Sequence, residues 1–218
     1  MEDTKARLTI TQKHLVTISA FTAKSDVARL RIALNEGLDA GLTVNEINEE
    51  LAHLYAYCGF PASIRGINTF KDVVNERKGK GIKDEKGKEA SPIDQSVSRY
   101  TRGENAQMIV TAMSAEQLKT LFAFNPLIDV FLKEHLFADI FDRDILSYVD
   151  REIVTVSALV SMVDPFIQSH VNGALNVGVT KEQLKELFDV MESKVGKREA
   201  DAGRKVLVEV LAARKNHN

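Results

Sequence analysis

The feature that most constrains this chain is an internal repeat, because few folds accommodate two copies of one short unit. Residues 14–20 read HLVTISA and residues 152–158 read EIVTVSA; LNEGLDAGLTVNEINEEL at 34–51 matches VNGALNVGVTKEQLKELF at 171–188. The offset is 138 residues for the first pair and 137 for the second. Each copy is too small to bury its apolar face alone, so the repeat predicts two units that pack together.

The second copy carries the start signals of three short helices. Asp150 is the expected N-cap of the first helix, ahead of apolar residues at helical spacing. Asp164 and Pro165 begin the second helix, since Asp caps free N–H groups and Pro suits the first helical position. Thr180 with Gln183 forms a capping box for the third.

The first copy shows the same organisation. Helices are expected over 11–23, 26–38 and 43–58, and the third should stop before Pro61, which disfavours helical geometry in the preceding residue. A fourth helix is expected over 62–74. Strand signals are scarce throughout, so the fold class is predicted to be all-α.

A charged segment separates the two copies. Residues 76–89 read ERKGKGIKDEKGKE, which offers little apolar surface to offset the entropy of ordering. A basic nucleic-acid arm is one interpretation, but acids are interleaved and aromatics are absent, so a solvated linker is favoured. We therefore divide the chain into a first repeat at 1–75, a charged flexible linker at 76–104 and a second repeat at 105–218.

Composition narrows the partners and the location. The chain has 29 basic and 31 acidic residues, so it has no overall charge bias toward nucleic acid or an anionic membrane. It shows no charged-then-apolar leader and no apolar run long enough to span a bilayer. The single cysteine, Cys58, rules out an intrachain disulfide and suits a reducing compartment. We expect a soluble, cytoplasmic protein that binds neither nucleic acid nor membranes.

The order and spacing of these pieces resemble the carboxymuconolactone decarboxylase and alkylhydroperoxidase-D-like family. The matching pieces are EIVTV at 152–156, SHVNGALNVGVT at 169–180, YCGFPA at 57–62 and the lead-in FADIF at 137–141. The resemblance covers most of the chain except the middle linker. It implies a duplicated helical bundle of the alkylhydroperoxidase-D-like type.

His170 and Glu152 are the candidate catalytic residues. Imidazole titrates near neutral pH and can serve as general acid or base, although a hydrogen-bonded core histidine is the interpretation that the residues alone favour. The resemblance reverses this preference, because His170 falls where the family places its active-site histidine. Glu152 would assist it; the alternative is a first-turn glutamate that faces the helix dipole. The first copy has Ala33 and His14 at the corresponding positions.

Tyr57 and Phe60 are the candidate substrate-binding residues. The first copy lacks the histidine but keeps this aromatic segment, so each copy would supply part of one shared site. If the copies pack about a pseudo-two-fold axis, both aromatic rings would line the cavity of His170. Alternatively, one copy is scaffold, or the pocket lies within one repeat or between chains.

The peroxidase branch of the family requires Cys-x-x-Cys ahead of the histidine, because peroxide reduction needs a thiolate and a resolving thiol. Val163 and Phe166 occupy those positions here, and Cys58 is expected to be a small buried filler. Histidine and cysteine spacing fits no zinc site, and no phosphate-binding or dinucleotide motif is present. Neither a metal nor another cofactor is predicted.

Together with the resemblance, the residues predict a cofactor-free lyase that acts on a small carboxylated, lactone-type substrate. Arg or Lys side chains would hold the carboxylate. An alkylhydroperoxidase-like antioxidant is one alternative, disfavoured by the missing dithiol, and a non-catalytic binding or assembly paralogue is another. We also expect a homo-oligomer, as a trimer of duplicated chains that mimics a hexamer of single-copy subunits.

Overall fold

The computed structural model describes residues 7–216 and is all-α over that range, as predicted. The helices are α1 (Ile10–Ala23), α2 (Val27–Asp39), α3 (Val44–Gly79), α4 (Arg99–Thr111), α5 (Ala115–Leu121), α6 (Pro126–Val130), the π-helix η2 (Phe131–Phe141), α7 (Tyr148–Met162), α8 (Ile167–Asn176), α9 (Lys181–Lys194) and α10 (Lys197–Lys215). Within the described part of the chain, no helix has the length and apolarity needed to cross a membrane.

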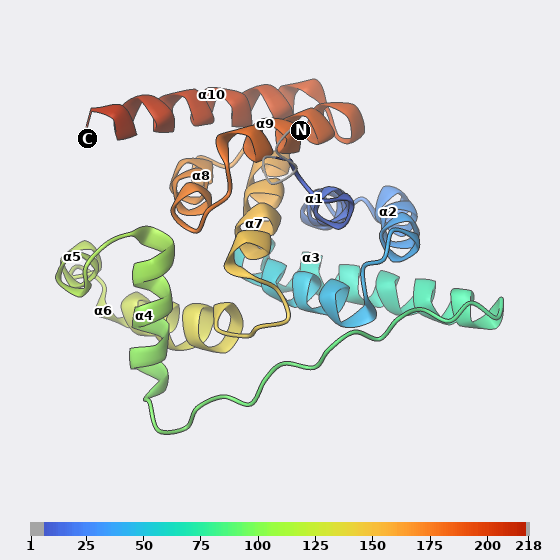
Figure 1. Cartoon of the computed structure of the whole chain (residues 1–218), viewed down its shortest axis with the longest axis horizontal. Coiled ribbons are helices and arrows are strands. Elements are labelled where there is room, and N and C mark those ends of the chain that lie inside the picture. The colour runs from blue at the N-terminus through green and yellow to red at the C-terminus, as the bar shows by residue number, and fades with distance from the viewer. Residues whose placement is uncertain (1–6, 217–218) are drawn as a thin grey trace, which may run out of the picture.

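Helices α1 and α7 pack against each other at the centre of the molecule (Figure 1). Helix α1 also contacts α2 and α3, whereas α7 contacts α8 and α9, and α10 lies across α8 and α9. Each half therefore places its helices around its own central helix in the same order along the chain. This arrangement is the one expected of two packed copies, while the duplication itself stays a prediction.

Helix α7 is buried on all sides. All eleven residues from Arg151 to Ser161 are buried. Arg151 and Glu152 are paired with Glu49 and His170, and from Ile153 on the stretch is apolar or small around its whole circumference rather than along one stripe. The hydroxyls of Ser157 and Ser161 donate to the backbone oxygens of Ile153 and Ala158, both at 2.7 Å. These bonds let polar side chains enter the core without unpaired groups.

Local signals predicted the starts of α3 and α9 but not those of α7 and α8. The start expected at Asp164 and Pro165 was wrong, because α8 begins at Ile167. The capping boxes at the starts of α3 and α9 form as predicted. The predicted N-cap Asp150 was wrong: Ser147 caps α7, and its hydroxyl accepts from the N–H of Asp150 at 3.1 Å. The helix therefore begins three residues earlier than its apolar periodicity indicates.

The stop predicted before Pro61 is a kink inside α3. Gly59 has φ 79° and ψ 158°, a left-handed φ that breaks the helix without ending the element. The second half continues to Gly79, beyond the expected end at residue 74.

The segment between the copies lacks regular structure only over residues 80–98, because 76–79 belong to α3 and 99–104 to α4. It is tied to the body of the protein: Val44 N–H donates to the oxygen of Glu85, and Asn45 N–H to that of Lys86, both at 2.9 Å. The flexibility of the segment and the three-part division of the chain stay predictions.

Helices α4, α5, α6 and η2 form a lobe beside α8 (Figure 1). Gly103 lets α4 and η2 meet closely, because a Cβ at this position would lie 1.7 Å from the backbone oxygen of Lys133. The buried ammonium of Lys133 binds Tyr100 at 2.8 Å, Glu104 at 2.9 Å and Asp129 at 3.0 Å. This packing holds α4 and η2 as one unit.

Candidate functional site

Glu152 and His170 come together where α7 passes α8. His170 Nδ1 lies 3.1 Å from Oε2 and 3.4 Å from Oε1 of Glu152, whose side chain is fully buried. A carboxylate only accepts, so the Nδ1–H group donates to it and the second nitrogen, Nε2, is left for another partner. Within the described residues Nε2 makes no hydrogen bond. The structure thus places the two predicted catalytic residues in contact.

Gly173 leaves room for this contact, although its role was not predicted from the sequence. It lies almost one turn after His170 on α8, and a Cβ there would lie 3.3 Å from Oε2 of Glu152. A side chain at Gly173 would therefore press on the carboxylate. In the sequence, the signal for this role is that Gly173 follows His170 by three residues, which places both on the same face of a helix.

Tyr57 brings the first half of the chain to His170. The two ring centroids lie 5.1 Å apart with the planes at 88°, an edge-to-face contact. Burial is the main cause that raises the pKa of the Tyr57 hydroxyl, with the charge of Glu152 second, so the phenol stays protonated at neutral pH. Tyr57 therefore lies beside His170, where it was predicted.

Phe60 does not reach His170. Its side chain is 61% exposed and stacks on Tyr55, with centroids 4.3 Å apart. It lines a separate apolar hollow that includes Ile64 and His135. The left-handed backbone at Gly59 turns the following residue away from the cavity of His170, so the two predicted substrate-binding residues lie in different cavities.

The cavity beside His170 has a volume of about 640 Å³ and walls that are mostly apolar. Helix α4 contributes Val110, η2 contributes Leu136 and Phe137, and α7 contributes Leu159. Among the described residues, no lysine or arginine lines this cavity. The basic side chain that was expected to hold a substrate carboxylate is therefore absent from its wall.

Gln107 is a buried polar side chain of this wall that was not predicted from the sequence. It is 2% exposed, and its Oε1 has no hydrogen-bond partner within the described residues. A buried acceptor without a partner is costly, so a donor on a bound ligand would stabilise it.

A second buried network lies behind Tyr57. Arg151 Nη2 donates to Glu49 at 2.6 Å, and its Nη1 lies 3.4 Å from His53 Nδ1. His53 Nε2 lies 2.8 Å from the Thr155 hydroxyl. Burial, followed by the charge of Arg151, lowers the pKa of His53 well below its usual value, so this ring is neutral. Since the rings of His53 and Tyr57 lie 5.1 Å apart, the network fixes the ring that faces His170.

The only thiol in the chain is not part of this cavity. Cys58 Sγ lies 3.1 Å from the backbone oxygen of Leu54, and burial raises the pKa of its thiol to about 11. Val163 and Phe166 stand where a peroxidase dithiol would be. Cys58 therefore has neither the position nor the thiolate character of a reactive cysteine.

No metal cluster is evident in residues 7–216, where no group of three or more His, Cys, Asp or Glu side chains is placed to hold an ion. The expectation that the site uses neither a metal nor another cofactor stays a prediction.

Residues 126–209 match the model of the carboxymuconolactone decarboxylase family. Over this segment, which is less than half of its length, the chain is similar to the carboxymuconolactone decarboxylase family. The matched segment contains Glu152, His170 and Gly173, so the histidine–glutamate pair lies within the carboxymuconolactone decarboxylase region and Tyr57 outside it. A search of the curated proteins found no match to the chain.

Proposed function

We propose that this protein is a cofactor-free lyase that acts by acid–base catalysis on a small carboxylated substrate of the lactone type. The observation that carries the proposal is the contact of His170 with the buried carboxylate of Glu152, at 3.1 Å, in the wall of a mostly apolar cavity. In such a pair, the carboxylate orients one imidazole nitrogen, and the other nitrogen is left to transfer a proton to the substrate.

In the proposed reaction, the bond between the substrate and its carboxyl carbon breaks and CO₂ leaves. The electron pair of that bond passes into the conjugated lactone, and protonated His170 delivers one proton from Nε2 to carbon. The neutral imidazole then takes a proton from water, so a carboxylate and a proton become CO₂ and a C–H bond. Glu152 accepts the hydrogen bond of Nδ1 and stabilises the cationic ring.

The apolar walls favour this step. Loss of CO₂ converts a localised carboxylate charge into a dispersed one, and a cavity lined by Leu136, Phe137 and Leu159 solvates the localised charge poorly. The neutral phenol of Tyr57 adds no competing charge beside His170.

Two alternative functions differ from the lyase in the molecules that they would convert or bind. An alkylhydroperoxidase-like antioxidant would reduce hydroperoxides with a thiol, which the single buried Cys58 disfavours. A non-catalytic binding or assembly paralogue would bind small acids without converting them.

Assays of the purified protein against these substrates test the proposal. We expect consumption of an unsaturated lactone acid with release of CO₂, and no thiol-dependent consumption of an alkyl hydroperoxide. Cys58→Ser should leave the first rate unchanged, since the thiol lies outside the cavity. Hydroperoxide reduction that disappears in Cys58→Ser would favour the antioxidant function instead. Binding of the lactone acid without turnover would favour the non-catalytic one.

We further propose that the protein is a cytoplasmic homo-oligomer, a trimer of chains. The second half of α3 and the lobe expose large apolar side chains, including Phe60 at 61%, Ile64 at 51% and Phe131 at 56%, which association would cover. Light scattering should give about three times the chain mass of 24.2 kDa. A monomer mass across micromolar concentrations would contradict this assembly.

A further inference from the structure

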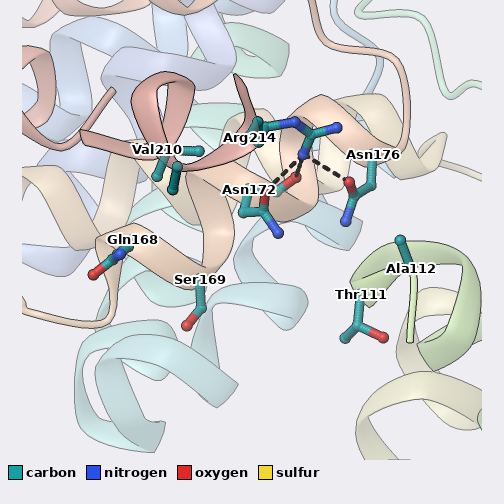
Figure 2. A pocket seen from close by; sticks show the side chains of 9 residues that line it. Thr111, Ala112, Gln168, Ser169, Asn172, Asn176, Val210 and Arg214 are labelled. Carbon is teal, nitrogen blue, oxygen red and sulfur yellow. Dashed lines mark hydrogen bonds between the residues drawn. The ribbon is translucent and has the colours of Figure 1, made fainter. Parts of the chain in front are cut away.

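A second pocket, of about 700 Å³, adjoins the cavity of His170. It lies between α8, the end of α10 and the end of α4 (Figure 2). The side chains of Thr111, Ser169 and Asn172 line both spaces, so a ligand can occupy the two together. Whereas the cavity of His170 is mostly apolar, six of the nine residues that line this pocket are polar: three carry amides, two carry hydroxyls and one is an arginine.

Arg214 supplies the guanidinium and is held by neutral groups. Its Nη1 donates to Asn172 Oδ1 at 2.6 Å and to Asn176 Oδ1 at 2.9 Å. Amide oxygens orient a guanidinium without neutralising its charge. Arg204, on the same helix, is different, because it pairs with Asp189 at 2.8 Å and Glu192 at 2.5 Å.

No acid within the described residues offsets the charge of Arg214. It forms no ion pair there, and neither Asp nor Glu lines the pocket. In Figure 2 the guanidinium lies over Asn172 and Asn176, and the side-chain nitrogens of both asparagines point away from it. That of Asn176 donates to the oxygen of Val110 at 3.0 Å, whereas that of Asn172 has no acceptor among the described residues. The pocket therefore offers a positive charge and a free amide donor.

We propose that this pocket binds the carboxylate of an organic acid, with Arg214 as the residue that recognises the charge and Asn172 as a neighbouring donor. This carboxylate is not the one that leaves as CO₂: the apolar part of the same molecule and its reacting carboxyl group lie in the cavity of His170. This inference rests on the proposed function in placing the reacting end beside His170, and it names the subsite that selects acids. Arg214 lies beyond the matched residues 126–209, so the family match does not assign it.

A carboxylate fits this pocket better than a phosphate does. One guanidinium and neutral amides balance a single negative charge. The Nη2–Nε edge of Arg214, which donates to no group within the described residues, matches the two oxygens of a carboxylate. A phosphate dianion would leave about one charge unbalanced next to an apolar cavity.

Binding of hexanoate to the full chain tests the proposal without reference to turnover. The dissociation constant is read from the chemical shifts of arginine Nε–H and asparagine side-chain amide signals during titration. Arg214→Gln should weaken binding by about tenfold or more, because a charge-assisted pair is lost. The matched control Arg204→Gln should change it by less than about twofold, since that residue lies outside both pockets. Hexanamide and acetate, which lack the charge and the apolar part respectively, should each bind wild type more weakly than hexanoate.

Several outcomes would overturn the proposal. Equal weakening in the two arginine variants, unchanged hexanoate binding in Arg214→Gln, or equal binding of hexanamide and hexanoate would each do so. Acetate that binds as tightly as hexanoate would overturn the placement of the apolar part. If Arg214→Gln unfolds, Arg214→Lys serves instead, because it keeps a positive charge at the end of α10. The proposal then requires the Arg214→Lys variant to retain part of the preference for hexanoate over hexanamide.

The same variants separate this subsite from the proposed lyase. Charge-selective binding that depends on Arg214, in a protein that turns over no lactone acid, would sustain the subsite and reject the lyase. If Arg214→Gln changes neither the turnover of the lactone acid nor the binding of hexanoate, the lyase is sustained and the subsite is rejected.

Discussion

His170→Gln is expected to lower kcat for the lactone acid by about 10²–10⁴-fold, the usual contribution of a positioned general acid or base. Glutamine can still donate a hydrogen bond to Glu152, but it cannot carry and release the proton at the position of Nε2. The substrate should still bind, because the apolar walls and Arg214 are unchanged. Initial rates across substrate concentrations measure the two quantities separately.

His135→Gln is the matched control for this substitution. His135 lies on η2, beside Tyr55 and Asp139, and lines the hollow of Phe60 rather than the cavity of His170. Its replacement should leave kcat within about threefold, as expected for a residue that does not touch the substrate. Similar losses in both variants, or a fully active His170→Gln variant, would remove His170 from the proposed role.

Gly103→Ala is expected to lower the free energy of unfolding by about 3 kcal/mol or more, at the upper end of overpacking effects. The added Cβ would lie 1.7 Å from the backbone oxygen of Lys133, and a backbone atom cannot rotate aside as a side chain can. Helix α4 must then move away from η2. Since α4 carries Gln107 and Val110 into the cavity wall, turnover should fall as well. Urea unfolding measures the first effect.

Gly79→Ala provides the control for this experiment, because both glycines are helical and a Cβ at Gly79 meets nothing within 4 Å. This change should leave stability unaltered or raise it by up to about 1 kcal/mol, the difference in helix propensity between the two residues. Equal destabilisation of the two variants would show that the close approach at Gly103 is not what matters.

Helix positions followed from local chemistry, whereas the pairing of His170 with Glu152 did not. Capping boxes such as Thr43 with Glu46 act within four residues, so the sequence states them directly. The contact of His170 with Glu152 was expected from family resemblance rather than from spacing, because it depends on how α7 and α8 cross.

The rest of the site depends on tertiary geometry. The direction of Phe60 is decided by the left-handed φ of Gly59, which the sequence allows without requiring it. Arg214 reaches Asn172 across 42 residues, from a last helical turn where a basic residue ordinarily complements the helix dipole. The spacing of Asn172 and Asn176, four residues apart, placed two amides on one face but did not identify their partner.

The central claim, that His170 gives a proton to carbon as CO₂ leaves, is tested most directly by turnover of the lactone acid in D₂O. The account predicts that wild type releases CO₂ and yields product with one solvent deuterium on a carbon of the conjugated lactone. Under the same conditions His170→Gln should form this product about 10²-fold more slowly or worse, while His135→Gln forms it at the wild-type rate. Product that lacks carbon-bound deuterium, or equal rates of labelled product in wild type and His170→Gln, would contradict it.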